Sequence, residues 1–217
     1  MIASLLAASL LCSAQEPMLL TPTDDVWVYG FAGDPTKDAY LRAWGANGRS
    51  VAGEKDSPDD FSYSLLQWDV SRVPEGEIKE ARLVLVSAPE SELTTEASKA
   101  APLEARAIAS GWTEKGWTYS LATKYGPGAE DRNLFGSGSL AKSSSKQTLI
   151  EIDLLKGPGD FRAALKAAKA SASQTLAIAL ASKVNTAEQG RSAIYKVFSK
   201  DGPADSRPVL RLVVSSG

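Results

Sequence analysis

The stretch SLLQWDVS at residues 64–71 is followed by a Pro74-Glu75-Gly76 turn and then by IKEARLVL at residues 78–85. Apolar residues alternate with other residues along both segments, which is the period-two pattern of a β-strand with two different faces. Proline and glycine between them favour a tight reversal of the chain. The sequence therefore predicts two strands joined by a turn at its centre.

Short apolar segments of the same kind recur on both sides of this centre, and Gly and Pro separate them, as in Gly126-Pro127-Gly128 and Asp201-Gly202-Pro203. Many short strands with such spacing are typical of a sandwich of two sheets. We predict an all-β fold, a jelly-roll-like antiparallel β-sandwich with one short helix. The expected strands are Val26–Phe31, Ala39–Trp44, Ser64–Val70, Ala81–Ser87, Leu103–Ala109, Thr148–Leu154, Thr175–Ala181, Ser192–Ser199 and Val209–Val214.

The one helix is expected after Asp160, which can cap it, with Phe161 and Leu165 on its buried face. Two stretches rich in Gly and Ser, Ala46–Phe61 and Lys124–Lys146, have the composition of long loops. Long loops in a compact domain are either functional segments or surface insertions. The sequence leaves both interpretations open.

Residues 1–14, MIASLLAASLLCSA, form an apolar run too short to span a bilayer, followed by the polar Gln15 and Glu16. This pattern predicts a signal peptide cleaved before Gln15. Acylation of Cys12 is the alternative, although Leu11 is larger than the small residue expected there. Cleavage removes the only cysteine, so residues 15–217 are expected to form a single domain without an internal disulfide, in a secreted, periplasmic or cell-surface protein.

Charge and composition restrict the partners and the chemistry. The 24 basic and 26 acidic residues are interspersed, so we expect no nucleic-acid partner, and no further apolar stretch predicts a membrane span. The oligomeric state is left open.

The absence of histidine excludes a Ser-His-Asp triad, a histidine base and the usual zinc hydrolases, and loss of Cys12 excludes thiol catalysis. What remains is carboxylate chemistry, with Glu114 and Asp131 as candidates, or a tyrosine acting with a lysine or arginine as in some polysaccharide lyases. No spacing marks a catalytic pair, so we predict that the chain is not an enzyme.

The order of the segments resembles a known family. The motifs are TDDVWVY at 23–29, YLRAWG at 40–45, the central 64–85 stretch, WTEKGWTY at 112–119, and FSKD at 198–201 with RPVLRL at 207–212. Together they resemble DNRLRE-type domains, which are grouped with alginate-binding carbohydrate-binding modules. Trp68 replaces the phenylalanine usual in that family, and Trp117 and Tyr119 stand where Val and Trp are common. The resemblance implies a jelly-roll sandwich that binds polysaccharide or serves as an accessory domain of surface proteins.

Sugar binding needs exposed aromatic rings beside hydrogen-bonding or charged side chains. Alternation along residues 40–44 places Tyr40, Arg42 and Trp44 on one face, and arginine suits an acidic polymer because its guanidinium pairs with carboxylates. In the central strand Trp68 should face the core, which would direct Gln67 to a polar rim. The competing interpretation is that the aromatics cap a sheet edge and the cations are merely solvated. The candidate carbohydrate-binding residues are Tyr40, Arg42, Trp44, Gln67, Trp117, Arg191 and Lys196.

Asp24, Asp25 and Asp153 are candidate ligands of a structural calcium ion, which prefers several oxygen ligands. Capping of turns at strand ends explains these aspartates equally well. The leading functional prediction is a secreted non-catalytic domain that binds a polysaccharide, in particular an acidic one. The alternatives are a structural or adhesive surface domain with a protein partner, and a polysaccharide lyase or hydrolase.

Overall fold

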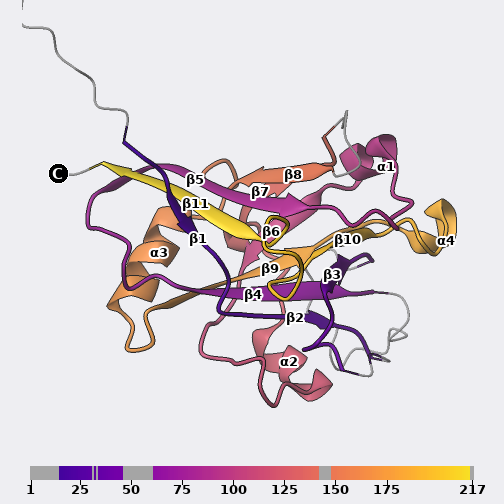
Figure 1. Cartoon of the computed structure of the whole chain (residues 1–217), viewed down its shortest axis with the longest axis horizontal. Coiled ribbons are helices and arrows are strands. Elements are labelled where there is room, and N and C mark those ends of the chain that lie inside the picture. Colours follow the sequence, from indigo (N-terminus) through magenta and orange to yellow (C-terminus); the bar gives the residue numbers. More distant parts are fainter. Residues whose placement is uncertain (1–14, 31, 33, 46–60, 142–147, 216–217) are drawn as a thin grey trace, which may run out of the picture.

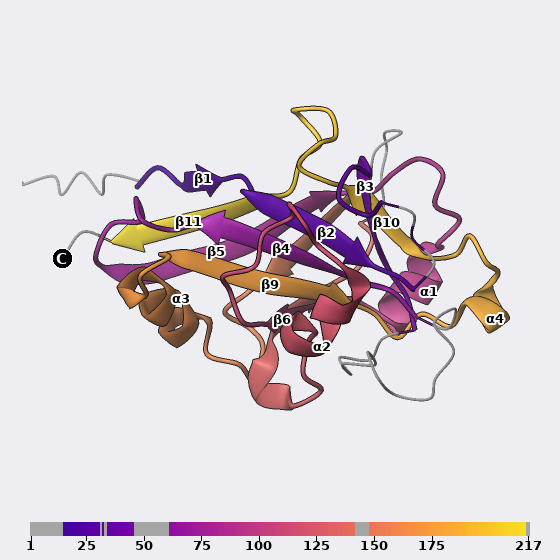
Figure 2. The same ribbon diagram turned by 90° about the horizontal axis from the view of Figure 1, so that it is seen from below.

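A computed structural model describes residues 15–30, 32, 34–45, 61–141 and 148–215. The predicted signal peptide and nearly all of the expected loop Ala46–Phe61 lie outside this range. The described chain is mainly β-structure in two packed sheets (Figures 1 and 2), and every strand pair is antiparallel. This confirms the predicted all-β sandwich.

One sheet has four strands, in the order β1 (Met18–Leu20), β11 (Val209–Ser215), β5 (Glu77–Val86) and β8 (Leu149–Asp153). The other has five, in the order β2 (Asp24–Val28), β4 (Tyr63–Asp69), β9 (Thr175–Ala181), β6 (Leu103–Ala107) and β7 (Leu134–Gly138). A two-stranded sheet pairs β10 (Tyr195–Phe198) with β3 (Tyr40–Ala43). Isolated bridges join Trp44 to Ser62 and Ser87 to Val197, so the short sheet lies beside the ends of β4 and β5.

The central strand β4 is buried on both faces. Leu66 and Trp68 point into the main core, where they meet side chains of the opposite sheet such as Leu83 and Leu212. Leu65 points the other way, into a second apolar cluster with Trp112 and Tyr125. The five-stranded sheet therefore has no open outer face at β4, because residues 108–125 pack against it.

The helix predicted after Asp160 is α3 (Phe161–Ala170), and the Asp160 side chain accepts a hydrogen bond from the Ala163 amide. Phe161 and Leu165 are its buried residues, as expected. The sequence pattern does not reveal the other short helices of the described chain. They are α1 (Thr95–Ala100), α2 (Ala122–Tyr125), α4 (Thr186–Gln189), and two 3-10 turns at Tyr119–Leu121 and Asp131–Asn133.

Helices α3 and α4 lie at opposite ends of the sandwich, and α2 lies on the outer side of the five-stranded sheet (Figures 1 and 2). Among the described residues no helix has the length and apolar character needed to cross a membrane. The α4 end is the end at which β2, β3 and β10 come together, and most of the predicted sugar-binding residues lie there.

Candidate functional site

The site begins with the alternation of two strands. On β3, Leu41 and Ala43 are buried whereas Tyr40 and Arg42 remain partly exposed. On β2, Val26 and Val28 are buried, and Trp27 is partly exposed together with Tyr29, the residue that follows the strand. Since side chains two residues apart share a face of a strand, Trp27 and Tyr29 form a pair beside the exposed face of β3.

Three rings from these strands form an aromatic row, defined here as Trp27, Tyr29 and Trp44. The Trp27 and Tyr29 rings are stacked, with centroids 5.4 Å apart and planes at 15°. Tyr29 and Trp44 are also 5.4 Å apart, at a tilt of 58°. Trp44 is the most buried of the three, at 9% exposed, and belongs to the edge of the core. The row therefore presents partly exposed aromatic surface beside β3, from Trp27 and Tyr29 in particular.

Arg42 is fixed on top of this row. Its guanidinium carbon lies 4.4 Å from the centroid of the Trp27 ring, a cation–π geometry. Its Nη1 donates to the Asp38 carboxylate, which also accepts the Tyr40 amide. The positive charge of Arg42 is therefore already compensated, and its remaining nitrogens present donors at a defined position.

A surface cavity of about 640 Å³ lies over the row and is called the groove from here on. Its other wall comes from α4 and the segment after it, and it contains Arg191. The Arg191 side chain is exposed and makes no ion pair or hydrogen bond with any residue in the described ranges. The groove residues are Trp27, Tyr29, Arg42, Trp44, Thr186, Ala187, Arg191 and Ile194.

The structure thus brings together three of the predicted sugar-binding residues: Arg42, Trp44 and Arg191. Tyr40 and Lys196 lie beside them on the same small sheet, where Lys196 is the cross-strand partner of Arg42. The Lys196 ammonium lies 4.1 Å from the Tyr40 ring centroid and forms an ion pair with Glu90 at 3.0 Å. Lys196 is therefore engaged with its neighbours and does not line the groove.

Gln67 does not join an exposed polar rim. It is 4% exposed, its Nε2 donates to the Trp112 carbonyl at 3.1 Å, and its Oε1 accepts the Gly111 amide at 2.9 Å. The physical reason is that residues 108–125 cover the face of β4 that alternation assigns to Gln67. Trp117 is buried in the same covering layer, 8% exposed, with its ring against Trp112 at 5.6 Å.

Two groove residues, Trp27 and Tyr29, are not among the sugar-binding residues predicted from the sequence. The alternation in DVWVY at residues 25–29 is the signal that could have found them, since it places both aromatics on one face. Asp38, which anchors Arg42 from the loop before β3, has no comparable signal, because its role depends on how that loop folds back.

The three predicted calcium ligands are not brought together. Asp153 lies on β8 of the four-stranded sheet, where its carboxylate accepts the Leu155 amide, whereas Asp24 and Asp25 lie on β2 of the other sheet. Asp24 accepts the backbone amide of Glu114. These are the turn-capping and loop-fixing roles expected of aspartates at strand ends.

Asp25 belongs instead to a different carboxylate cluster, with Glu114 and Asp201, whose oxygens lie within 4.8 Å of one another. The Lys200 ammonium bonds Glu114 at 2.8 Å and Asp201 at 3.1 Å, and the Lys200 amide donates to Asp25 at 2.6 Å. Burial raises the pKa of Asp25 to about 7, against the opposing effect of the Lys200 hydrogen bond. The cluster already contains its own cation and ties β2, the 111–117 segment and the turn after β10 together.

This arrangement also bears on catalysis by paired carboxylates. Glu114 is neutralised by Lys200, and the second candidate, Asp131, begins the exposed 3-10 turn Asp131–Asn133 and is not part of the cluster. No pair of free carboxylates faces the groove among its described lining residues.

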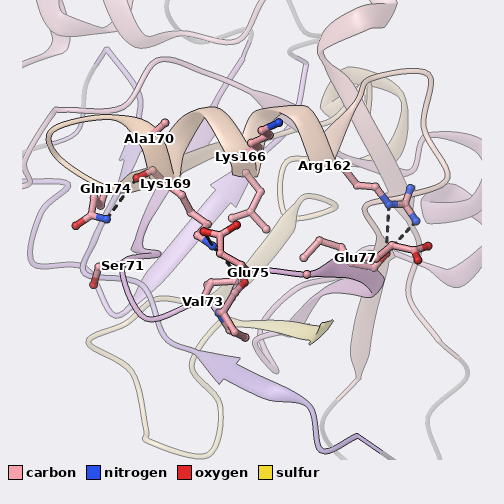
Figure 3. Close-up of a pocket in the computed structure, with 13 residues that line it drawn as sticks. Ser71, Val73, Glu75, Glu77, Arg162, Lys166, Lys169, Ala170 and Gln174 are labelled. Atoms are coloured by element: carbon pink, nitrogen blue, oxygen red, sulfur yellow. Dashed lines mark hydrogen bonds and ion pairs between the residues drawn. The ribbon is translucent and has the colours of Figure 1, made fainter. Parts of the chain in front are cut away.

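A second cavity, of about 520 Å³, lies between α3 and the turn that leads into β5 (Figure 3). Its polar groups bond one another: Arg162 donates twice to the Ile78 carbonyl, and Lys169 bonds the Pro74 carbonyl and Glu75. The amino end of Lys166 lies on the opposite side of α3 from Glu75 (Figure 3). These contacts fasten the helix to the turn, and they leave no cation directed into the cavity.

The groove between β2, β3 and the segment after α4 is therefore the best-built candidate site of the described chain. Comparison of the sequence with protein-family models and with curated proteins finds no match.

Proposed function

We propose that this chain is a non-catalytic polysaccharide-binding domain and that the groove is its binding site. The observation that carries the proposal is the aromatic row with Arg42 stacked on it, next to Arg191, which has no ion pair with any residue in the described ranges. Sugar rings stack on flat apolar faces while their hydroxyls need fixed donors and acceptors around them. The row supplies the first requirement, and Arg42 and Thr186 supply the second.

The charges of the groove favour an acidic polymer. Arg42 is balanced by Asp38, so Arg191, which forms no ion pair among the described residues, adds a positive charge at the rim. A guanidinium binds a carboxylate through two parallel hydrogen bonds, which a neutral sugar cannot reproduce. We therefore expect polymers of uronic acids to bind more tightly than neutral glucans.

Affinity electrophoresis in gels that contain alginate, pectin or a neutral glucan tests the proposal. The wild-type protein should be retarded most by an acidic polymer. Arg191→Gln should abolish most of that retardation, and the matched control Arg132→Gln, which changes an exposed arginine outside the groove, should leave it unchanged.

Tyr29→Ala should reduce retardation by every polymer that binds, because it removes the middle ring of the row. Circular dichroism must show that each variant is folded. Unchanged mobility of the folded wild-type protein in all three gels contradicts the proposal and favours the adhesive alternative, in which the partner is a protein.

A further inference from the structure

The groove ends beside a further cation, Lys196. Its cross-strand partner Arg42 lines the groove, and so does Ile194, which precedes it by two residues. Residues directly opposite each other in an antiparallel pair of strands point to the same face of the sheet. Lys196 therefore lies at the boundary of the groove, on the face of the small sheet that also presents Arg42.

The surroundings of Lys196 are of the same kind as those of Arg42, with an aromatic ring beneath the cation and a carboxylate beside it. The ring is that of Tyr40, whose centroid lies 4.1 Å from the Lys196 ammonium. The carboxylate is that of Glu90, at 3.0 Å. In the free protein, each of the two cations is thus paired with a carboxylate of the chain itself.

The two carboxylates differ in how firmly they are held. The Asp38 side chain is 25% exposed and accepts the Tyr40 amide in addition to Arg42. The Glu90 side chain is 56% exposed, whereas that of its partner Lys196 is only 17% exposed. An ion pair with one such exposed member contributes little to stability. A competing carboxylate can therefore displace Glu90 much more easily than Asp38.

The backbone around Glu90 is fastened independently of this ion pair. The Ala88 amide donates to the Lys196 carbonyl at 2.8 Å, and the Ser91 hydroxyl donates to the Ile194 carbonyl at 2.7 Å. Residues 88–92 are thereby held along β10, so the Glu90 side chain can turn away without any change in the fold. The hydrogen bond from Lys196 lowers the pKa of Glu90, so this carboxylate is charged at neutral pH.

We propose that Glu90 is a built-in competitor of the ligand: its carboxylate occupies Lys196 in the free protein, and a carboxylate of the bound polysaccharide replaces it there. This inference rests on the proposed function of the groove. It adds Lys196 as a further point at which an acidic sugar unit is recognised, and it makes Glu90 the residue that limits the preference for acidic over neutral polymers.

The test is isothermal titration of the wild-type protein and of Glu90→Gln with hexamannuronate and hexagalacturonate. Glu90→Gln should bind the acidic oligosaccharide about two- to fivefold more tightly, the effect of an exposed ion pair that no longer competes. Its affinity should also fall more steeply with salt concentration, because binding no longer breaks an ion pair of the protein. The double variant Glu90→Gln/Lys196→Gln should lose the gain.

The matched control is Glu188→Gln. Glu188 is an exposed carboxylate of α4, close in sequence to the groove residues Thr186 and Ala187, and it forms no ion pair among the described residues. This variant removes the same charge near the groove without releasing Lys196. At physiological salt concentration it should bind with nearly wild-type affinity.

Three results overturn the inference while leaving the groove as a binding site: no gain in folded Glu90→Gln, a gain that persists in the double variant, or an equal gain in Glu188→Gln. Failure of the wild-type protein to bind either oligosaccharide, alginate or pectin has a different meaning. It refutes the proposed function itself and this inference with it.

Discussion

The buried carboxylate of Asp25 predicts an unusual dependence of stability on pH. Asp25 is 2% exposed, and its pKa is raised from 3.8 to about 7, mainly because burial disfavours the charged form. The unfolded chain loses this proton near pH 3.8, whereas the folded chain holds it until about pH 7. The energetic cost of ionising Asp25 is therefore absent at low pH, grows as pH rises to about 7 and is constant above that value.

The magnitude follows from the two pKa values. Linkage gives a loss of about 3 kcal/mol in the free energy of unfolding between about pH 5 and pH 8 for this group alone. The sequence contains no histidine, so the usual titrating side chain of this range does not contribute. The exposed carboxylates with lowered pKa values, such as Asp34 and Glu90, affect stability only at more acidic pH.

Urea denaturation of the wild-type protein at several pH values from 5 to 8 measures this effect. The wild-type free energy of unfolding should fall as pH rises. Asp25→Asn should be nearly independent of pH, because its amide oxygen can still accept the Lys200 amide without ionising. The control Asp131→Asn should keep the wild-type slope. A wild-type stability that is constant or increases from pH 5 to 8, or an unchanged slope in Asp25→Asn, would refute this account of Asp25.

Three further predictions concern the architecture around the groove. Gln67→Leu should lower the free energy of unfolding by about 1–3 kcal/mol, because it leaves the buried Trp112 carbonyl without its partner and removes the acceptor of the Gly111 amide, and polysaccharide affinity of the folded variant should be unchanged. In urea denaturation, Gly76→Ala should lower the free energy of unfolding more than Gly111→Ala. Both glycines have positive φ, but only at Gly76 would the new Cβ clash with the backbone, lying 2.0 Å from the Ser215 carbonyl oxygen. Calcium or EDTA should leave the melting temperature unchanged, because the Lys200 ammonium already bonds the acidic cluster; a rise with calcium would contradict this.

The strands were predictable where a period-two pattern was present. The segment VLRLVVS of β11 alternates between buried and half-buried residues as its sequence indicates. Strand β7 was not predictable, since it lies in the glycine-rich stretch that was expected to be a loop. Its glycines have a packing role: a Cβ at Gly136 would lie 2.2 Å from the Asp153 carbonyl, and one at Gly138 would lie 2.4 Å from that of Glu151.

The candidate site was predictable only in part for a different reason. Alternation assigns each side chain to a face of its strand, and it placed Tyr40 and Arg42 correctly on the exposed face of β3. It cannot say whether a distant segment covers that face, and this is why Gln67 was expected in a polar rim although residues 108–125 bury it. The joining of Arg191 to the aromatic row likewise depends on long-range packing that no local pattern encodes.

The clamp on Arg42 has a consequence for the dynamics of recognition. A free arginine has many rotamers and loses that freedom when it binds a ligand. Here Asp38 and the Trp27 ring restrict Arg42 as the chain folds, so the donor is in place before any polymer arrives. Arg191, by contrast, is exposed and has no ion pair or hydrogen bond with the described residues. If the groove binds a polymer as proposed, encounter should resemble docking onto a surface in which Arg42 is already fixed and only Arg191 has still to be ordered.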